Sequence, residues 1–221
     1  MSSNNTPPAV KICCIQSIVE AQLALSAGAS ALGLVARMPS GPGPISDEAI
    51  AEIVAALPTE TDTFLLTSET EADAIIAHHA RCPTRTLQLV DAVSHADLQR
   101  IRAALPFTRL VQVIHVVGPE SLIEALEVAP LVDALLLDSG NPSAAVKELG
   151  GTGRVHDWSV SQSIVAQSGV PVWLAGGLNP SNVREAIETV QPHGLDLCSS
   201  VRTNGVLDSA KLTAFFEAVN S

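Results

Sequence analysis

Two residues that lie far apart in the chain could carry out proton-transfer chemistry. Cys13 ends a short apolar stretch that begins at Ala9, and Asp138 ends the run Leu135-Leu136-Leu137. A short apolar run that stops at turn residues is typical of a strand buried on both faces. A carboxylic acid can donate a proton, and a thiolate can accept one. The two groups could therefore act on neighbouring atoms of one substrate, if the fold brings them together.

Both residues also have structural explanations. A free cysteine such as Cys13 is most often a small buried hydrophobic residue. Asp138 is followed by Ser139 and Asn141, so it could equally be a cap or turn residue. From the residues alone, the chemical and the structural roles both stay open.

The elements that must position these residues alternate regularly between strand and helix. Eight strand–helix pairs are expected over residues 9–221, the first strand from Ala9 to Ile15 and the last from Gly194 to Ser199. Strands separated by helical patterns pair in parallel, and eight such units predict a single-domain (β/α)8 TIM barrel. A doubly wound open sheet is the alternative, but Cys13 to Ser17 is not the glycine-rich turn that it requires. Residues 1–8 are polar and are expected to form a flexible tail.

The carboxyl ends of barrel strands are where function is expected. The seventh strand is followed by Gly176-Gly177 and the eighth by Ser199-Ser200. Loops at these two places often bind phosphate through backbone N–H groups, and glycine lets the backbone approach closely. We therefore predict a phosphate cradle there, with a tight turn that holds no ligand as the alternative.

The alternation of side chains along a strand makes a further prediction for the first strand. If Cys13 points into the barrel mouth, so does Lys11, whereas Ile12 and Cys14 face the helices. Histidines on predicted helices are expected to be solvated; these are His78, His79 and His95.

The composition argues against several classes of protein. Hydrophobic residues make up 47% of the 221 residues and charged residues 16%, which indicates a large core. The net charge is −11 and no basic stripe occurs, so nucleic acid is not an expected partner. We find no apolar run of membrane-spanning length and no signal sequence, so no membrane partner and a cytoplasmic location are expected. The four cysteines contain no C-x-x-C pair, so neither a metal nor a redox site is expected; they are Cys13, Cys14, Cys82 and Cys198.

Four motifs occur in order along nearly the whole chain. They are Val10-Lys11-Ile12-Cys13, Leu136-Leu137-Asp138-Ser139, Gly150-Gly151-Thr152-Gly153 with Asp157-Trp158, and Ala175-Gly176-Gly177-Leu178-Asn179-Pro180. Together they resemble the phosphoribosylanthranilate isomerase family of tryptophan biosynthesis. The resemblance implies a cofactor-free (β/α)8 barrel that catalyses an Amadori rearrangement of an aminoaldose phosphate to an aminoketose phosphate.

The resemblance also implies roles for individual residues. Asp138 would be the general acid that protonates the ribose ring oxygen, and Cys13, as a thiolate, the base that removes the C2 proton. Lys11 is a candidate for favouring the thiolate. The substrate is expected to be a small phosphosugar, and the protein a monomer or homodimer. Residues expected to bind the substrate or its phosphate are Lys11, Gly151, Thr152, Gly153, Gly176, Gly177, Asp196, Ser199 and Ser200.

The chain departs from the family pattern near the expected site. The family usually has glycine at Cys14 and at Ser200, and a histidine at Val90. The loop from Pro39 to Gly43 lacks the arginine that the family uses for the anthranilate carboxylate, and Arg37 is out of register. Such a charge-assisted contact is worth roughly 1.5–3 kcal/mol. Two alternatives therefore stay open: an isomerase of another phosphorylated aminosugar, and a non-catalytic phosphosugar-binding barrel.

Overall fold

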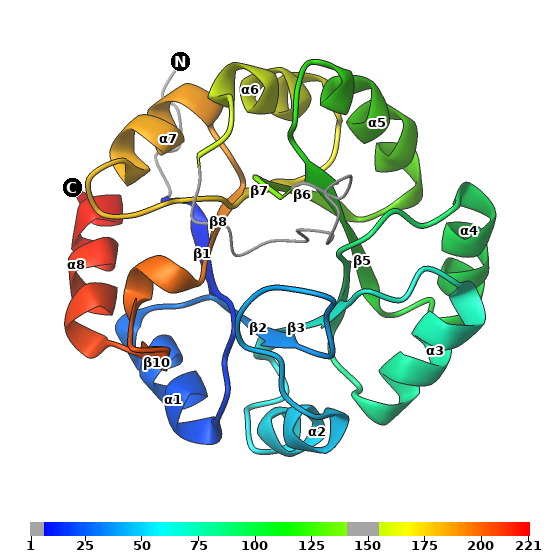
Figure 1. Cartoon of the computed structure of the whole chain (residues 1–221), viewed down its shortest axis with the longest axis horizontal. Coiled ribbons are helices and arrows are strands. Elements are labelled where there is room, and N and C mark those ends of the chain that lie inside the picture. The colour runs from blue at the N-terminus through cyan, green and yellow to red at the C-terminus, as the bar shows by residue number, and fades with distance from the viewer. Residues whose placement is uncertain (1–6, 141–154) are drawn as a thin grey trace.

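The protein is a closed barrel of parallel strands in the computed structural model, which describes residues 7–140 and 155–221. The strands β1 to β8 follow one another around the ring, and β8 pairs with β1 to close it. Figure 1 shows the strands at the centre and the helices around them. The predicted (β/α)8 TIM barrel is confirmed, and the open-sheet alternative is wrong. Of the predicted tail, residues 1–6 lie outside the described part.

The bounds of the elements follow the predicted alternation. The barrel strands are β1 (Ala9–Ile12), β2 (Ala31–Val35), β3 (Asp62–Thr67), β4 (Thr86–Leu89), β5 (Arg109–His115), β6 (Ala134–Asp138), β7 (Val172–Leu174) and β8 (Gly194–Leu197). The helices are α1 (Ile18–Ala27), α2 (Asp47–Ala55), α3 (Ala72–Arg81), α4 (His95–Ala104), α5 (Glu120–Val128), α6 (Trp158–Gln167), α7 (Val183–Val190) and α8 (Ser209–Asn220). Two 3-10 turns and a small hairpin complete them: η1 (Ala129–Leu131), η2 (Ser199–Val201), β9 (Arg202–Thr203) and β10 (Val206–Leu207). Within the described ranges, we find no helix with the length and apolar character needed to cross a bilayer.

Local side-chain chemistry explains where the helices begin and end. The Ser17 side chain accepts a hydrogen bond from the Glu20 amide, and Ser46 does the same for the Ala49 amide. Each serine satisfies one of the first N–H groups, which have no partner inside the helix. Gly28 ends α1 with a φ of 111°, a left-handed conformation that glycine adopts without strain.

Alternation along the strands separates two hydrophobic clusters. On β6, Leu135 and Leu137 pack in the larger cluster that includes helix residues, whereas Leu136 packs in the smaller cluster with Phe64 and Trp173 of other strands. Asp138 has the same parity as Leu136. The strand therefore delivers its carboxylate to the inside of the barrel, at its carboxyl end.

Two strands are shorter than predicted, and the reason is local backbone geometry. β1 ends at Ile12 rather than Ile15, because Cys14 has a φ of 62° and so leaves the extended conformation. β8 ends at Leu197 rather than Ser199, because Ser199 starts a 3-10 turn. Both ends open into the loops that surround the barrel mouth.

The histidines of α3 are buried, so the expectation that they are solvated is wrong. His78 and His79 are 6% and 8% exposed. His79 Nε2 lies 2.9 Å from the carbonyl oxygen of Thr84, and His78 contacts groups on neighbouring elements. His95, at the start of α4, is exposed as expected. A buried partner for each ring explains the difference, since a hydrogen-bonded imidazole can be desolvated without a large penalty.

Gly194 is the register partner of Trp173 across the β7–β8 pair, and its substitution should destabilise the barrel. A Cβ added there would lie 2.4 Å from Cε3 of the buried Trp173. We expect Gly194→Ala to lower the free energy of unfolding by roughly 1–3 kcal/mol, measured by urea denaturation, because strand and indole must both shift.

Gly118→Ala is the matched control for that variant. Its added methyl group would meet only the flexible Glu120 carboxylate, which can move away. Equal stability of the two variants would contradict the packing argument.

Candidate active site

A cavity at the carboxyl ends of the strands collects most of the predicted site residues. Cys13, which follows β1, and Asp138, which ends β6, both line it. These strands are far apart in the chain and on the ring. The other predicted site residues that line this cavity are Gly176, Gly177, Asp196, Ser199 and Ser200. The predicted residues Gly151, Thr152 and Gly153 lie outside the described residues.

Cys13 is held at the cavity wall as a buried thiol. Its backbone amide donates to the carbonyl oxygen of Leu197 at 2.7 Å, which extends the β1–β8 ladder by one bond. The absent side chain of Gly33 makes room for it, since a Cβ there would lie 2.8 Å from Cys13 Sγ. Burial raises the pKa of Cys13 to about 12, and the positive charge of Lys11 only partly opposes this. Without substrate, the group is therefore a neutral thiol at pH 7.

Lys11 forms a buried ion pair with Asp196 directly across the β1–β8 ladder. The two residues are register partners, and Lys11 Nζ lies 2.8 Å from Asp196 Oδ2. Nζ also donates to Gln88 Oε1 at 2.8 Å and lies 5.0 Å from the centroid of the Phe64 ring. Burial alone would lower the pKa of Lys11, but Asp196, together with Cys13 and Asp138, raises the pKa overall.

The cavity wall around this pair is formed by Asp196 and Gln88 rather than by Lys11. Lys11 lies behind them and is fully buried. The structure therefore places Lys11 where it can act on Cys13 and Asp196 through its charge. A direct contact of Lys11 with substrate would require its two partners to move.

Asp138 is positioned by its own loop and by β5. Its Oδ1 accepts a hydrogen bond from the Ser139 amide at 2.8 Å. Its register partner His115 does not line the cavity, and His115 Nε2 lies 2.9 Å from the carbonyl oxygen of Val90. His156 lies close enough for the Asp138 charge to affect it: burial lowers the pKa of His156, and Asp138 opposes this. Among the described residues, Asp138 is thus a cavity acid with a histidine in its neighbourhood.

The predicted phosphate cradle consists of two tight backbone turns. Gly176 and Gly177 have φ values of 85° and 64°, which favour glycine. The carbonyl oxygen of Gly177 accepts hydrogen bonds from Asn179 Nδ2 at 3.0 Å and Asn182 Nδ2 at 3.1 Å, so the turn is fixed. No described residue that lines the cavity is a lysine or arginine. An anion bound here would therefore rely on backbone N–H groups and serine hydroxyls.

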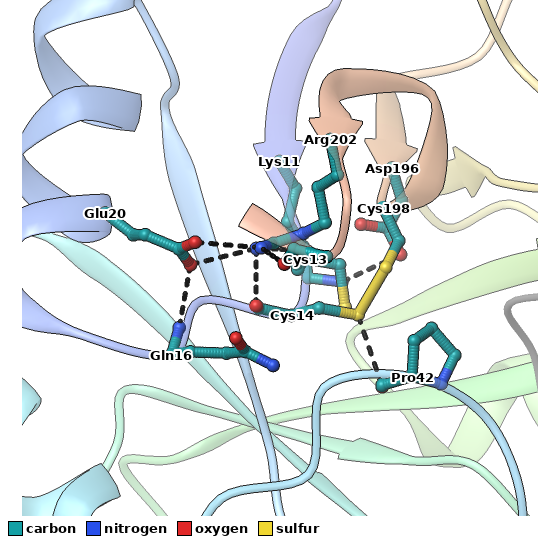
Figure 2. Close-up of a disulfide and its surroundings, with 10 residues drawn as sticks. Lys11, Cys13, Cys14, Gln16, Glu20, Pro42, Asp196, Cys198 and Arg202 are labelled. Carbon is teal, nitrogen blue, oxygen red and sulfur yellow. Dashed lines mark hydrogen bonds and ion pairs between the residues drawn. A yellow bond between two sulfur atoms is a disulfide. The ribbon is translucent and has the colours of Figure 1, made fainter. Parts of the chain in front are cut away.

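Arg202 is a site residue that the sequence analysis missed. It lies just after the turn that follows β8, and its guanidinium donates to both carboxylate oxygens of Glu20, at 2.9 and 3.1 Å. It also donates to the carbonyl oxygens of Cys13 and Cys14, as Figure 2 shows. Burial alone would raise the pKa of Glu20, but these and two backbone hydrogen bonds lower it. Arg202 thereby positions the segment that carries Cys13; its partner 182 residues away left no local signal.

A disulfide joins Cys14 to Cys198 at the cavity wall, and the position of Cys14 corrects one expectation. Their Cα atoms are 5.9 Å apart, and 184 positions separate them in the chain. Cys14 was predicted to face the helices, but its left-handed backbone breaks the alternation and turns it into the cavity. The absence of a C-x-x-C pair gave no sign of this disulfide, because that pattern detects only cysteines that are neighbours in sequence.

The loop after β2 covers one side of the cavity. Met38, Ser40, Gly41 and Pro42 line it, and none of them is charged. Arg37, the nearest basic residue in this loop, is exposed and is not part of the wall. The structure thus offers no cation from this loop at the place where the resemblance implies a carboxylate-binding arginine.

A separate group of possible metal ligands lies on the outer helices. Asp47, His78 and Cys82 offer ligand atoms within 4.8 Å of one another. All three already have protein partners: Asp47 contacts His78 and Arg81, His78 also contacts Thr67, and Cys82 Sγ lies 3.7 Å from the carbonyl oxygen of Asp47. We interpret the group as a network that fastens α2 to α3.

Comparisons with known proteins point to one family over the whole chain. The family model described as N-(5'phosphoribosyl)anthranilate (PRA) isomerase matches residues 10–218. A protein named N-(5'-phosphoribosyl)anthranilate isomerase from Haloferax volcanii is 37% identical, covering 96% of this chain and 93% of the relative. One of the same name from Methanosarcina acetivorans is 33% identical, covering 95% and 92%.

Solved structures of proteins with this name have the same architecture. The phosphoribosyl anthranilate isomerase from Thermotoga maritima superposes with a TM-score of 0.82 at 26% identity, covering 96% of this chain and 98% of the other. The enzyme from Thermus thermophilus gives 0.79 at 27% identity, with the same coverage. The likeness thus extends to the whole barrel.

The raised pKa of Cys13 predicts how fast its thiol is alkylated. Iodoacetamide reacts with the thiolate, so the rate at Cys13 should rise about tenfold per pH unit from pH 7 and should not level off by pH 10. Peptide mass spectrometry assigns the modified cysteine. The same residue in urea-unfolded protein is the reference and should level off above pH ~8.5. If the alkylation rate of the folded protein levelled off near pH 8.5, burial would not be raising the pKa of Cys13.

Proposed function

The chain belongs to the N-(5'-phosphoribosyl)anthranilate isomerase family, and on that premise we propose that it catalyses the Amadori rearrangement of N-(5-phosphoribosyl)anthranilate to the 1-deoxyribulose 5-phosphate product. The observation that carries the proposal is the shared cavity of Cys13 and Asp138, beside two turns suited to a phosphate. Each step of this reaction moves a proton, and the two side chains supply the transfers. The reaction as proposed therefore needs no cofactor.

Asp138 starts the reaction as the general acid. Its proton goes to the ring oxygen of the ribose, the C1–O bond breaks, and the nitrogen lone pair forms the protonated Schiff base. The hydrogen bond from the Ser139 amide to Oδ1 orients the carboxyl group and leaves Oδ2 for the substrate. A fixed acid within hydrogen-bond reach contributes about 10²–10⁴-fold to such a step.

Cys13 acts second, as the base that takes the proton from C2. Its neutral thiol must first ionise, and the cationic Schiff base nitrogen supplies the positive charge that favours the thiolate. Lys11 adds to this effect, although Asp196 neutralises most of its charge at short range. The enolamine that results then tautomerises to the ketose. In this proposal, the substrate's own intermediate completes the activation of Cys13.

The phosphate is held by the turns after β7 and β8. Gly176 and Gly177 expose backbone N–H groups because they have no side chains, and Ser199 and Ser200 begin the η2 turn. The first N–H groups of such turns have no partner within the turn and suit an anion. This binding mode fits an acidic protein, because it needs no basic surface.

The aromatic acid end of the substrate is where this chain differs from its family pattern. The uncharged wall from Met38 to Pro42 favours a second candidate, an isomerase of another phosphorylated aminosugar. The chemistry at Cys13 and Asp138 would be the same. The non-catalytic alternative is not supported, because the chain belongs to an isomerase family. A cytoplasmic location and a monomeric or homodimeric state stay predictions.

Removing either proposed catalytic group should abolish most of the turnover. We expect Cys13→Ala and Asp138→Asn each to lower kcat by about 10²–10⁴-fold, measured by the fall in substrate fluorescence. Cys82→Ala is the matched control, because that buried thiol lies outside the cavity. Activity that survives both substitutions would refute the assignment of roles.

The uncharged loop predicts weak recognition of the substrate's ring carboxylate. We compare phosphoribosylanthranilate with the analogous phosphoribosylated amine that lacks this carboxylate. The two values of kcat/KM should differ by less than about tenfold, since an ordinary charge-assisted contact would be worth ten- to a hundredfold. Steady-state kinetics with both amines measure the ratio. A loss beyond about a hundredfold would contradict this expectation and favour phosphoribosylanthranilate over other aminosugars.

A further inference from the structure

The disulfide Cys14–Cys198 joins two segments of the cavity wall, and Cys14 contacts a third. Cys14 directly follows Cys13, and Cys198 directly precedes Ser199 and the η2 turn. The third segment is the loop after β2: a Cβ added to Gly43 would lie 2.5 Å from Cys14 Cβ, and Cys14 Sγ lies 3.5 Å from the carbonyl oxygen of Pro42. Figure 2 shows the sulfur bridge between the two strand ends, with Pro42 beside it.

The backbone conformation at Cys14 is unusual for a residue with a side chain, which indicates that the disulfide has a role in the site. Cys14 has a φ of 62°, where a residue with a side chain is strained and glycine is not. Such strain persists only where the surrounding structure fixes it, and it is concentrated at functional sites. The Cα separation of 5.9 Å lies within the usual range for disulfides. At Cys14, an unfavourable backbone angle therefore coincides with a disulfide at the cavity wall.

We propose that Cys14–Cys198 is a redox-sensitive latch that positions the phosphate-binding turn next to Cys13, so that reduction weakens substrate binding. The proposal rests on the proposed function. A dithiol reductant would transfer two electrons: its two thiols form one disulfide, the Cys14–Cys198 bond breaks, and each protein sulfur takes one proton. Disulfides in reducing compartments are usually catalytic or redox-sensing, which agrees with a latch at an active site.

Reduction should affect binding more than chemistry. The hydrogen bond from the Cys13 amide to the Leu197 carbonyl oxygen and the one from Arg202 to the Cys13 carbonyl oxygen do not involve the disulfide, so we expect the base to stay at its strand end in either state. The turn at Ser199 loses its covalent tie to β1. A disulfide sulfur carries no proton, whereas the Cys14 thiol could donate to the Pro42 carbonyl and so shift the loop after β2. The latch therefore predicts a change in KM, with kcat nearly constant.

The test compares isomerase kinetics of the oxidised and the dithiothreitol-reduced protein. We expect reduction to raise KM about tenfold and to change kcat less than about threefold, with KM restored on reoxidation. Thiol counting under denaturing conditions confirms each state, because all four cysteines are free only after reduction. Unchanged KM with four free thiols would overturn the latch. A fall in kcat with constant KM would contradict the positioning role.

Variants separate the latch from general effects of reductant. The double variant Cys14→Ser with Cys198→Ser should have the KM of the reduced protein and should not respond to dithiothreitol. Cys82→Ser keeps the bridge and should respond like the unmodified chain. If circular dichroism shows that the double variant does not fold, the reversible change in KM of the unmodified chain tests the latch.

Inorganic phosphate gives a readout that does not depend on turnover. It should raise the melting temperature of the oxidised protein more than that of the reduced protein, because the latch shapes the phosphate turn. If neither state turns over substrate, the proposed function is wrong. The difference between the two shifts in melting temperature then tests the latch by itself. Equal shifts in both states would overturn it.

Discussion

The hydrogen-bond ladder between β1 and β8 closes the barrel, and the candidate site depends on it. This seam brings the first strand beside the last, so that Lys11 faces Asp196 in register and Cys13 bonds to Leu197. The same seam places Cys14 next to Cys198, and Arg202 next to the carbonyls that follow Cys13. Without this pairing, nothing would hold the Cys13 thiol beside the turn that follows β8.

Charge at the seam is nearly balanced, and this balance shapes the chemistry. Lys11 and Asp196 neutralise each other under the cavity, and the described wall adds no basic side chain. A thiol in such a place is a weak base at rest, as the raised pKa of Cys13 indicates. A substrate that becomes cationic during the reaction would supply the missing charge itself. A base of this kind is active mainly when the correct intermediate is present.

The sequence predicted the repeating order of strands and helices and the features that neighbouring residues determine. The alternation of strand and helix patterns predicted the barrel, and the expectation of site residues at the strand ends agrees with the cavity that Cys13 and Asp138 line. Predictions failed where the local structure depends on one backbone angle or on a residue far away in the chain. The turn at Cys14 ended both the strand and the parity rule, and the partners of Cys14 and Glu20 lie more than 180 residues away. No local pattern contains such information.

The sulfur bridge has a topological consequence for the chain. It encloses the segment from Cys14 to Cys198, which contains most of the barrel, in a covalent ring. One proteolytic nick in a loop within that segment would leave both fragments attached through sulfur. The severed molecule would migrate as two pieces only after thiol treatment, and its halves could not diffuse apart before then.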